Sequence, residues 1–218
     1  MPRRGVSKRP PSEAVLERRA QRRAAILDVA DAVIRRDGPA ASINQISAEA
    51  GVAKPILYRH FGDKDGLYQA LAERYVHDAM DEIRRGLAEA EGPRARLAAT
   101  IGAYLTFVDR HAEQYDFLMR RAVRDGAGAR ATVTDFIQQV AAEVTVELGE
   151  ELRAARLDSG PAEPWAHGIV GMVQLAGDWW LRNRTMSRER LVEYLTSLLW
   201  DGFNGMVNAA PETSTATG

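Results

Sequence analysis

Residues 42–67 read SINQISAEAGVAKPILYRHFGDKDGL, and this run carries the start and stop signals of two short helices. Ser42 and Gln45 have the spacing of a capping box, in which each side chain pairs with an otherwise unpaired amide at a helix start. Gly51 ends that helix and begins a tight turn. Pro55 suits the first turn of a second helix, because the amide it lacks would have no helical partner there. The run therefore predicts two short helices joined by a tight turn.

The residues on either side of this run predict a longer helix before it and another after it. Apolar side chains recur at three- and four-residue spacing from Ile26 to Val33, which indicates an amphipathic helix that ends at Gly38. After the run, Asp63 can cap a long helix over about 64–91. A helix followed by two short helices with a tight turn between them predicts a helix-turn-helix unit.

The helix expected at 55–61 has two chemically different faces. Leu57 and Phe61 are four residues apart, so they share a face that can pack on the two preceding helices. The rest of the helix carries a proline, an apolar side chain, a phenol and a guanidinium but no acid, which suits contact with thymine methyls, phosphates and guanine edges. The residues concerned are Pro55, Ile56, Tyr58 and Arg59.

The charge distribution separates the first part of the chain from the rest. Residues 1–64 contain 13 Lys or Arg and 7 Asp or Glu, a balance of +6, whereas the remaining residues contain 16 and 23, a balance of −7. This asymmetry favours an anionic partner for the first part. Residues 1–15 are expected to form a disordered basic arm, either a minor-groove contact or a bare tail.

Beyond the helix-turn-helix, the periodicity predicts helices and no convincing strand. These helices are expected at about 93–110, 112–123, 128–157, 162–183 and 187–206. We therefore expect an all-α chain with a helix-turn-helix domain at 16–66, a helical ligand-binding and dimerisation domain at 67–208, and a disordered tail at 209–218. The chain has no cysteine, no long apolar run and no visible signal peptide, so we expect a cytoplasmic protein without a membrane partner.

The run from Ser42 to Leu67 is similar to the signature of the TetR family of transcriptional regulators, and the resemblance covers roughly residues 20–70. It implies a one-component regulator, of the repressor type, that binds palindromic double-stranded operator DNA as a homodimer. The residues that the resemblance places in or beside the DNA groove are Ser42, Lys54, Pro55, Ile56, Tyr58, Arg59, His60 and Lys64. Asp63 departs from the usual Ser or Asn; it still caps a helix, but it places a carboxylate near the DNA.

The last two expected helices supply a candidate dimer interface, because Gly168 and Gly171 permit close approach of a second helix. The interface candidates are Met172, Leu175, Trp180, Leu195, Leu199 and Phe203, with the subunit's own core as the alternative for each. Aromatic residues and their neighbours in the body are candidates for a pocket between helices. They are Tyr104, Phe107, Tyr115, Phe117, Met119, Phe136, Gln174, Asp178 and Trp179. The long apolar helices favour a small apolar effector such as a fatty acid or an acyl-CoA.

Two other classes of protein fit a helical chain less well. An enzyme is disfavoured because the sequence has no G-x-S-x-G, H-E-x-x-H or phosphate-loop motif. His77 and Asp81 share a helix face, but no third ligand is evident, so we expect no metal site and no cofactor. An architectural or adaptor DNA protein would have a sealed body, whereas a sensor would have a cavity on the order of several hundred Å³. Packing between helices is the alternative role for Tyr58. A core histidine bonded to a carbonyl oxygen is the alternative for His60, and a solvated lysine at a helix start is the alternative for Lys64.

Overall fold

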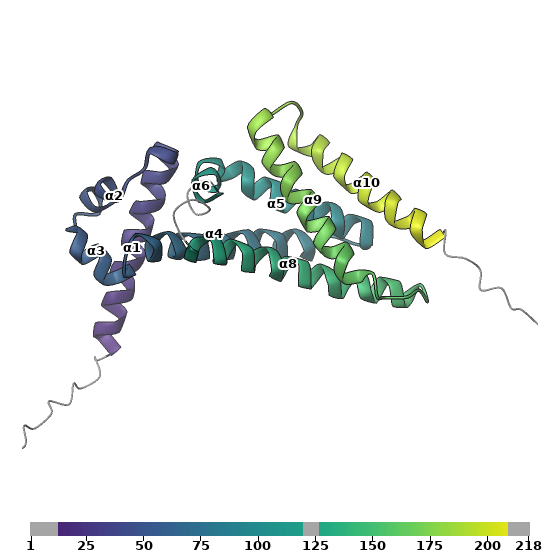
Figure 1. Cartoon of the computed structure of the whole chain (residues 1–218), viewed down its shortest axis with the longest axis horizontal. Helices are drawn as coiled ribbons and strands as arrows, with labels where there is room; N and C mark the ends of the chain where they lie inside the picture. The colour runs from purple at the N-terminus through teal and green to yellow at the C-terminus, as the bar shows by residue number, and fades with distance from the viewer. Residues whose placement is uncertain (1–12, 120–126, 209–218) are drawn as a thin grey trace, which may run out of the picture.

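The computed structural model of the chain describes residues 13–119 and 127–208, with side chains up to residue 202, and every described element is a helix (Figure 1). The elements are α1 (Glu13–Asp37), η1 (Gly38–Ala40), α2 (Ile43–Glu49), α3 (Lys54–Phe61), α4 (Lys64–Ala88), α5 (Pro93–Arg110), α6 (Ala112–Phe117), α8 (Ala127–Ala154), α9 (Ala162–Asn183) and α10 (Arg188–Asn208). The predicted all-α fold is confirmed. The expected tail, most of the expected basic arm and the predicted end of the helix at 112–123 lie outside the described residues.

The turn between α2 and α3 forms where the sequence places its signals. The Gln45 amide donates a hydrogen bond to Ser42 Oγ at 3.4 Å, and the Ser42 amide donates one to Gln45 Oε1 at 3.0 Å, so the capping box is complete. Gly51 has a φ of +61°, in the left-handed region that favours glycine. The Ser47 hydroxyl donates to the Val52 carbonyl oxygen at 2.6 Å, and this buried bond fixes the turn.

The first three α-helices pack around one apolar core. Val33 and Ile34 of α1, Ile46 of α2 and Leu57 of α3 are all fully buried. Burial of such a side chain contributes about 1.5–3 kcal/mol, so these four residues determine which face of each helix turns inward. The opposite face of α3 is thereby held at the surface.

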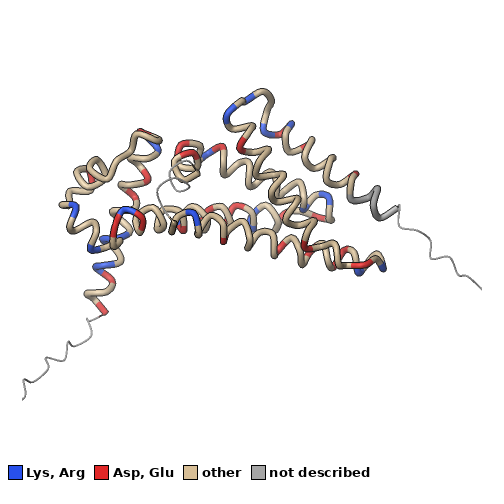
Figure 2. The backbone as a smooth tube through the Cα atoms, viewed as in Figure 1, with Lys and Arg blue, Asp and Glu red and all other residues tan. Residues whose placement is uncertain are grey.

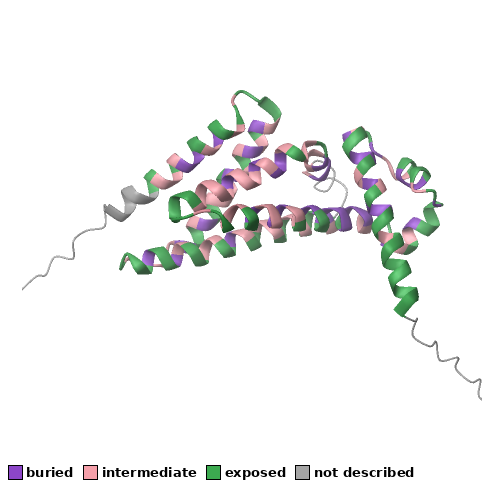
Figure 3. Ribbon diagram, turned by 180° about the vertical axis from the view of Figure 1, so that it is seen from behind, coloured by how far each residue is buried: buried purple, intermediate pink, exposed green. Residues whose placement is uncertain are grey.

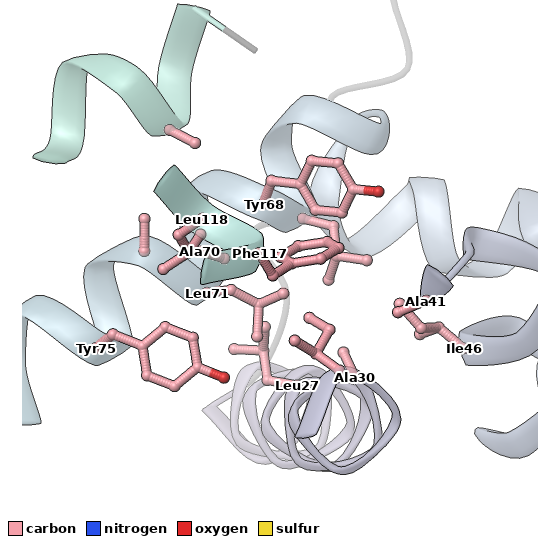
Figure 4. Packing of buried hydrophobic residues seen from close by; sticks show 14 of the residues in the cluster. Leu27, Ala30, Ala41, Ile46, Tyr68, Ala70, Leu71, Tyr75, Phe117 and Leu118 are labelled. Carbon is pink, nitrogen blue, oxygen red and sulfur yellow. The ribbon is translucent and has the colours of Figure 1, made fainter. Parts of the chain in front are cut away.

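The long helix α4 links this three-helix unit to the rest of the molecule, which we call the body. Figure 4 shows Leu27 of α1, Leu71 and Tyr75 of α4 and Phe117 of α6 gathered in one apolar cluster. The cluster therefore continues from the helix-turn-helix into the body, across the boundary expected between residues 66 and 67.

Four helices enclose the interior of the body, and a fifth covers one side. α4 packs against α5 and α8, α8 packs against α9, and α10 lies along α5 (Figure 1). A second group of buried residues joins α5, α9 and α10, and it comprises Ile101, Leu105, Val173, Trp180, Leu191 and Leu195. No described helix combines the length and the apolar character that crossing a membrane requires.

Candidate DNA-binding surface and ligand cavity

α3 turns one face into the protein and leaves the other exposed. Leu57 and Phe61 are buried, which confirms the predicted inward face. The exposed residues of the helix are Lys54, Pro55, Ile56 and Arg59. Ile56 is notable among them, because 37% of this apolar side chain remains exposed. The exposed part of the helix thus offers an apolar group and two cations, a combination that suits base edges and phosphates.

Three further predicted DNA contacts lie around α3 with part of their surface covered. Tyr58 is half-buried. The Lys64 ammonium lies 5.4 Å from the centre of the Tyr68 ring. The Ser42 hydroxyl donates to Gln45 Oε1 at 2.8 Å in addition to its capping role. A phosphate would therefore compete with the capping box for the polar groups of Ser42.

His60, the remaining predicted contact, lies at the end of α3 among arginines. Its Nδ1 atom is buried and finds no hydrogen-bond partner within the described parts of the chain. Burial lowers the pKa of His60, and the charges of neighbouring arginines lower it further. The imidazole is therefore neutral at pH 7. These arginines are Arg19, Arg59, Arg22 and Arg23.

Three of those arginines belong to α1 and are not among the predicted DNA contacts. Arg19, Arg22 and Arg23 stand at helical spacing in the sequence, so they share one side of α1. That spacing was the signal in the sequence from which a basic side of α1 could have been predicted. Their proximity to α3 depends on the angle at which the two helices cross, and local sequence patterns do not predict that angle.

A cavity of about 570 Å³ lies in the body between α4, α5, α8 and α9. Six of the nine predicted pocket residues line it, namely Tyr104, Phe107, Tyr115, Met119, Phe136 and Gln174. Much of the remaining wall comes from the apolar stripe of α4, including Val76, Ala79, Met80 and Ile83. The lining residues of α4 run from Ala72 to Leu87, about 22 Å along the helix axis, so the cavity is elongated.

Three predicted pocket residues are not on the cavity wall. Phe117 is 1% exposed, and its ring packs edge-on against Tyr68 at 5.1 Å in the core. The Asp178 carboxylate accepts a hydrogen bond from the Tyr115 hydroxyl and lies behind the wall. Trp179 is 42% exposed on the outer side of α9. The structure corrects the prediction at these positions.

Tyrosine hydroxyls are the main uncharged polar groups of the wall. Tyr104 Oη and Tyr115 Oη lie 3.2 Å apart, and Tyr75 donates a hydrogen bond to Asp31 of α1. Burial raises the pKa of Tyr75, Tyr104 and Tyr115 above the ordinary tyrosine range. All three hydroxyls therefore remain protonated at neutral pH and act as neutral hydrogen-bonding groups.

The charged residues of the wall come from α5 and α8. Arg96 Nη2 lies 2.6 Å from Glu147 Oε1 in an ion pair, and Glu143 and Glu151 line the same region. Arg96 is the only cation among the described lining residues, and its charge is already balanced. The cavity thus suits an apolar chain and offers no unpaired cation to an anionic head group.

The outer sides of α9 and α10 expose large apolar side chains. These outer apolar residues are Met172 (37% exposed), Leu175 (70%), Trp179 (42%), Tyr194 (49%) and Leu198 (61%). A Cβ atom added to Gly168 or Gly171 would meet nothing within 4 Å, so α9 is open to the close approach of another helix.

Three predicted interface residues have other positions, and a fourth is not placed. Trp180 is 2% exposed and donates its indole N–H to the Met186 carbonyl oxygen at 2.8 Å, and Leu195 is 6% exposed, so both belong to the subunit's own core. Leu199 lines the cavity. The side chain of Phe203 lies outside the described part of the structure. Of the predicted set, Met172 and Leu175 remain available to a partner.

The structure offers no metal site within the residues it describes, where no group of three or more His, Asp or Glu side chains is suitably placed. His77 Nε2 and Asp81 Oδ2 form an exposed pair at 3.4 Å without a third ligand.

Two family models match the chain. Residues 26–71 match the bacterial regulatory proteins of the tetR family, and residues 82–216 match the tetracyclin repressor-like C-terminal domain. An uncharacterised HTH-type transcriptional regulator of Mycobacterium tuberculosis is 32% identical over 194 residues, which are 88% of this chain and 82% of the relative. The HTH-type transcriptional activator FasR of Mycolicibacterium smegmatis is 28% identical over 190 residues, 85% of this chain and 84% of FasR.

Solved structures share the fold at lower identity. A tetR-family transcriptional regulator from Streptomyces coelicolor has a TM-score of 0.66 at 24% identity, over 87% of this chain and 86% of its own. The regulator FadR from Bacillus subtilis, solved in complex with stearoyl-CoA, has a TM-score of 0.68 at 17% identity, over 82% of this chain and 98% of its own.

Proposed function

The chain belongs to the TetR family of bacterial transcriptional regulators, and on that basis we propose that it is a homodimer whose affinity for operator DNA is set by an apolar ligand in the body. The helix-turn-helix is the DNA-binding domain of this family, whose members are regulators and not enzymes. Dimer formation, the ligand and the direction of regulation are the parts that need support from this chain's own residues.

In this proposal α3 enters the major groove of operator DNA with its outward face. Arg59 reads a guanine edge and Ile56 packs on a thymine methyl, contacts that these side chains make in other complexes. Lys54, Tyr58 and Lys64 hold phosphates, which fix the register of the helix on the duplex. The exposed position of Ile56 supports the proposal, because DNA would cover this apolar surface. The remaining predicted contacts are Ser42, Pro55 and His60.

Two copies join through the outer apolar residues of α9 and α10. Leu175 is the most exposed of them, and such surfaces on a soluble protein commonly mark an interface. The open sides of Gly168 and Gly171 allow a partner helix to approach closely. A symmetric dimer presents two α3 helices to a palindromic site, so each half-site is read by one subunit.

The ligand that we propose is a fatty acid or an acyl-CoA whose hydrocarbon chain occupies the cavity. The elongated, mostly apolar wall supports this class, and the volume lies in the range of small-molecule sites. FadR, which shares the fold, was solved with stearoyl-CoA bound. Because Arg96 is paired with Glu147, an anionic head group would either displace Glu147 or remain outside the wall.

Ligand binding reaches α1 through Tyr75. The ring of this residue lines the cavity, and its hydroxyl donates to Asp31 of α1, which also accepts a hydrogen bond from Gln114 at 3.2 Å. A second link, the ion pair of Arg74 with Asp28 at 2.7 Å, lies one residue away on α4. A ligand that moves Tyr75 therefore moves the helix-turn-helix, and it changes DNA affinity only by as much as it prefers one arrangement over the other. This double contact of Tyr75 is the observation that carries the proposed function.

The experiment measures operator affinity by fluorescence anisotropy with stearoyl-CoA, stearate or coenzyme A added to the full chain. We expect stearoyl-CoA and stearate, which both carry the hydrocarbon chain, to change the affinity at least about fivefold, a typical coupling, and coenzyme A to leave it unchanged. Val140→Trp fills the cavity from α8 and should abolish the response without altering affinity in the absence of ligand. Ala142→Trp, on an exposed position of the same helix, is the matched control. A Val140→Trp variant that responds like the wild type would contradict the proposed site.

The direction of regulation depends on where the operator lies relative to the promoter. Repression stays a prediction from the sequence, and FasR is named an activator. A promoter–reporter assay with and without the regulator decides between the two: repression predicts higher output when the regulator is deleted, and activation predicts lower output.

A further inference from the structure

α1 begins well before the segment that the tetR-family model covers. The helix starts at Glu13 and the match starts at residue 26, so 13–25 form about 20 Å of additional helix. Every residue from 13 to 22 is exposed (Figure 3), including the apolar Val15 and Leu16. Packing within the subunit therefore contributes little to this segment.

One side of the segment faces the end of α3. Arg19 Nη2 donates to the Arg59 carbonyl oxygen at 3.3 Å. The Arg23 guanidinium lies 5.0 Å from the centre of the Phe61 ring. Arg22 shares this side of the helix at i+3 from Arg19, and Figure 2 shows the Lys and Arg positions of α1 and α3 in the same part of the molecule.

These arginines have no carboxylate partner among the described residues, whereas many arginines of the body are paired with one. The neutralised arginines elsewhere include Arg36, Arg74, Arg84, Arg85, Arg96, Arg110, Arg184 and Arg188, each in an ion pair with an Asp or Glu. Within the described residues, Arg19, Arg22 and Arg23 form no such pair. The segment 13–25 holds four arginines and two glutamates, so it carries a positive balance beside the DNA-facing helix.

We propose that this segment of α1 is a second DNA-contacting element, in which Arg19 and Arg22 bind phosphates that border the groove occupied by α3. The inference rests on the proposed position of α3 in the major groove. Guanidinium groups pair with phosphate through charge-assisted hydrogen bonds, and the strand next to a recognition helix presents phosphates to the elements that flank that helix. The stacking of Arg23 on Phe61 holds the segment against α3. The contacts are sequence-independent and add to those of the outward face of α3.

The test measures the salt dependence of DNA binding. The probes are a labelled duplex that the wild-type chain has selected from a random pool and a scrambled duplex of the same length. The test variant is Arg19→Gln/Arg22→Gln, and the control is Arg35→Gln/Arg153→Gln, which removes the same charge from exposed positions on α1 and α8. Affinity falls as salt rises, and each lost phosphate contact reduces the magnitude of the slope of log affinity against log salt by about 0.9. We therefore expect the magnitude of the slope to decrease by about 2 for each bound subunit of the test variant.

Both probes should lose affinity by the same factor in the test variant, because phosphate contacts carry no sequence information. A slope that changes no more than in the control, or a loss confined to the selected duplex, overturns the proposal. If the wild-type chain selects no sequence at all, the proposed function fails first. If selection succeeds and only the slope prediction fails, α3 binds DNA without help from residues 13–25 of α1.

Discussion

Tyr75 donates a hydrogen bond to Asp31 while its ring lines the cavity, so one side chain touches both the ligand space and the first helix of the DNA-binding unit. Asp31 is shared with Gln114 from α6, and the three residues join α1, α4 and α6 at one point. The apolar cluster in Figure 4 surrounds this point, which makes independent movement of α1 and α4 costly. A change of shape in the cavity therefore has a direct route to the helix-turn-helix.

Tyr75→Phe should weaken the communication between ligand and DNA while preserving both binding sites. The ring remains on the cavity wall, but Asp31 loses one donor, which costs about 1–3 kcal/mol of stability. We expect the affinity for stearoyl-CoA to stay within twofold of the wild type, measured by calorimetry, and the effect of stearoyl-CoA on DNA affinity to fall at least about fivefold. Tyr104→Phe removes another wall hydroxyl that bonds within the body and should keep the full effect. Equal behaviour of the two variants would exclude Tyr75 as the link.

Arg59→Ala should relax base preference at one position of each half-site. The guanidinium lies on the exposed face of α3, and loss of a bidentate contact to guanine costs about 1–3 kcal/mol. Selection from a random duplex pool, followed by sequencing, measures the preference at every position. Arg35→Ala on α1 removes the same charge away from α3 and should leave the profile unchanged. An unaltered profile for Arg59→Ala would show that this residue does not read a base.

Leu175→Glu should shift the dimer toward monomers. The substitution replaces the most exposed apolar side chain of α9 with a carboxylate. In a symmetric interface each subunit would bury one such carboxylate without a cationic partner. We expect the dimer dissociation constant to rise at least about tenfold, equivalent to about 1.4 kcal/mol, by analytical ultracentrifugation. Ala142→Glu adds the same charge to α8 and should leave the dimer intact. A Leu175→Glu chain that sediments as the wild type does would place the interface elsewhere.

His60 should make the free energy of unfolding depend on pH near neutrality. Burial and neighbouring arginines lower its pKa in the folded state, so the unfolded chain takes up this proton more readily. The contribution is fully present above the ordinary histidine pKa of about 6.5 and declines as the pH falls below it. Urea unfolding of the wild type and of His60→Gln between about pH 5 and 8 should give a shallower decline for the variant. Parallel curves would contradict the assigned environment of His60.

Much of the DNA-binding unit could be predicted because its signals are local. The capping box at Ser42, the left-handed Gly51 and the pairing of Leu57 with Phe61 each act within a few residues, and the structure has all three. Local patterns of this kind determine where a helix begins, where it ends and which face is apolar.

The body was harder to predict because its apolar helix faces occupy three different environments, namely the cavity wall, the core and the outer surface. The sequence cannot separate Met80, on the cavity wall, from Phe117, in the core, or Trp179, on the outside, since all three are apolar residues at helical spacing. Trp180 shows the same difficulty. It directly follows Trp179, yet the turn of α9 places one indole in the core and the other at the surface. Only the crossing of the helices decides between these positions.

Selection of fragments by the purified full-length chain from a random duplex pool tests the central claim most directly. Placement of two α3 helices on one duplex predicts a palindrome whose half-site centres lie about 34–36 Å apart or a multiple of that, bound about 10³-fold or more tightly than scrambled DNA. Enrichment of no sequence, or binding that does not discriminate between selected and scrambled duplexes, would contradict the assignment of α3 as the element that reads DNA.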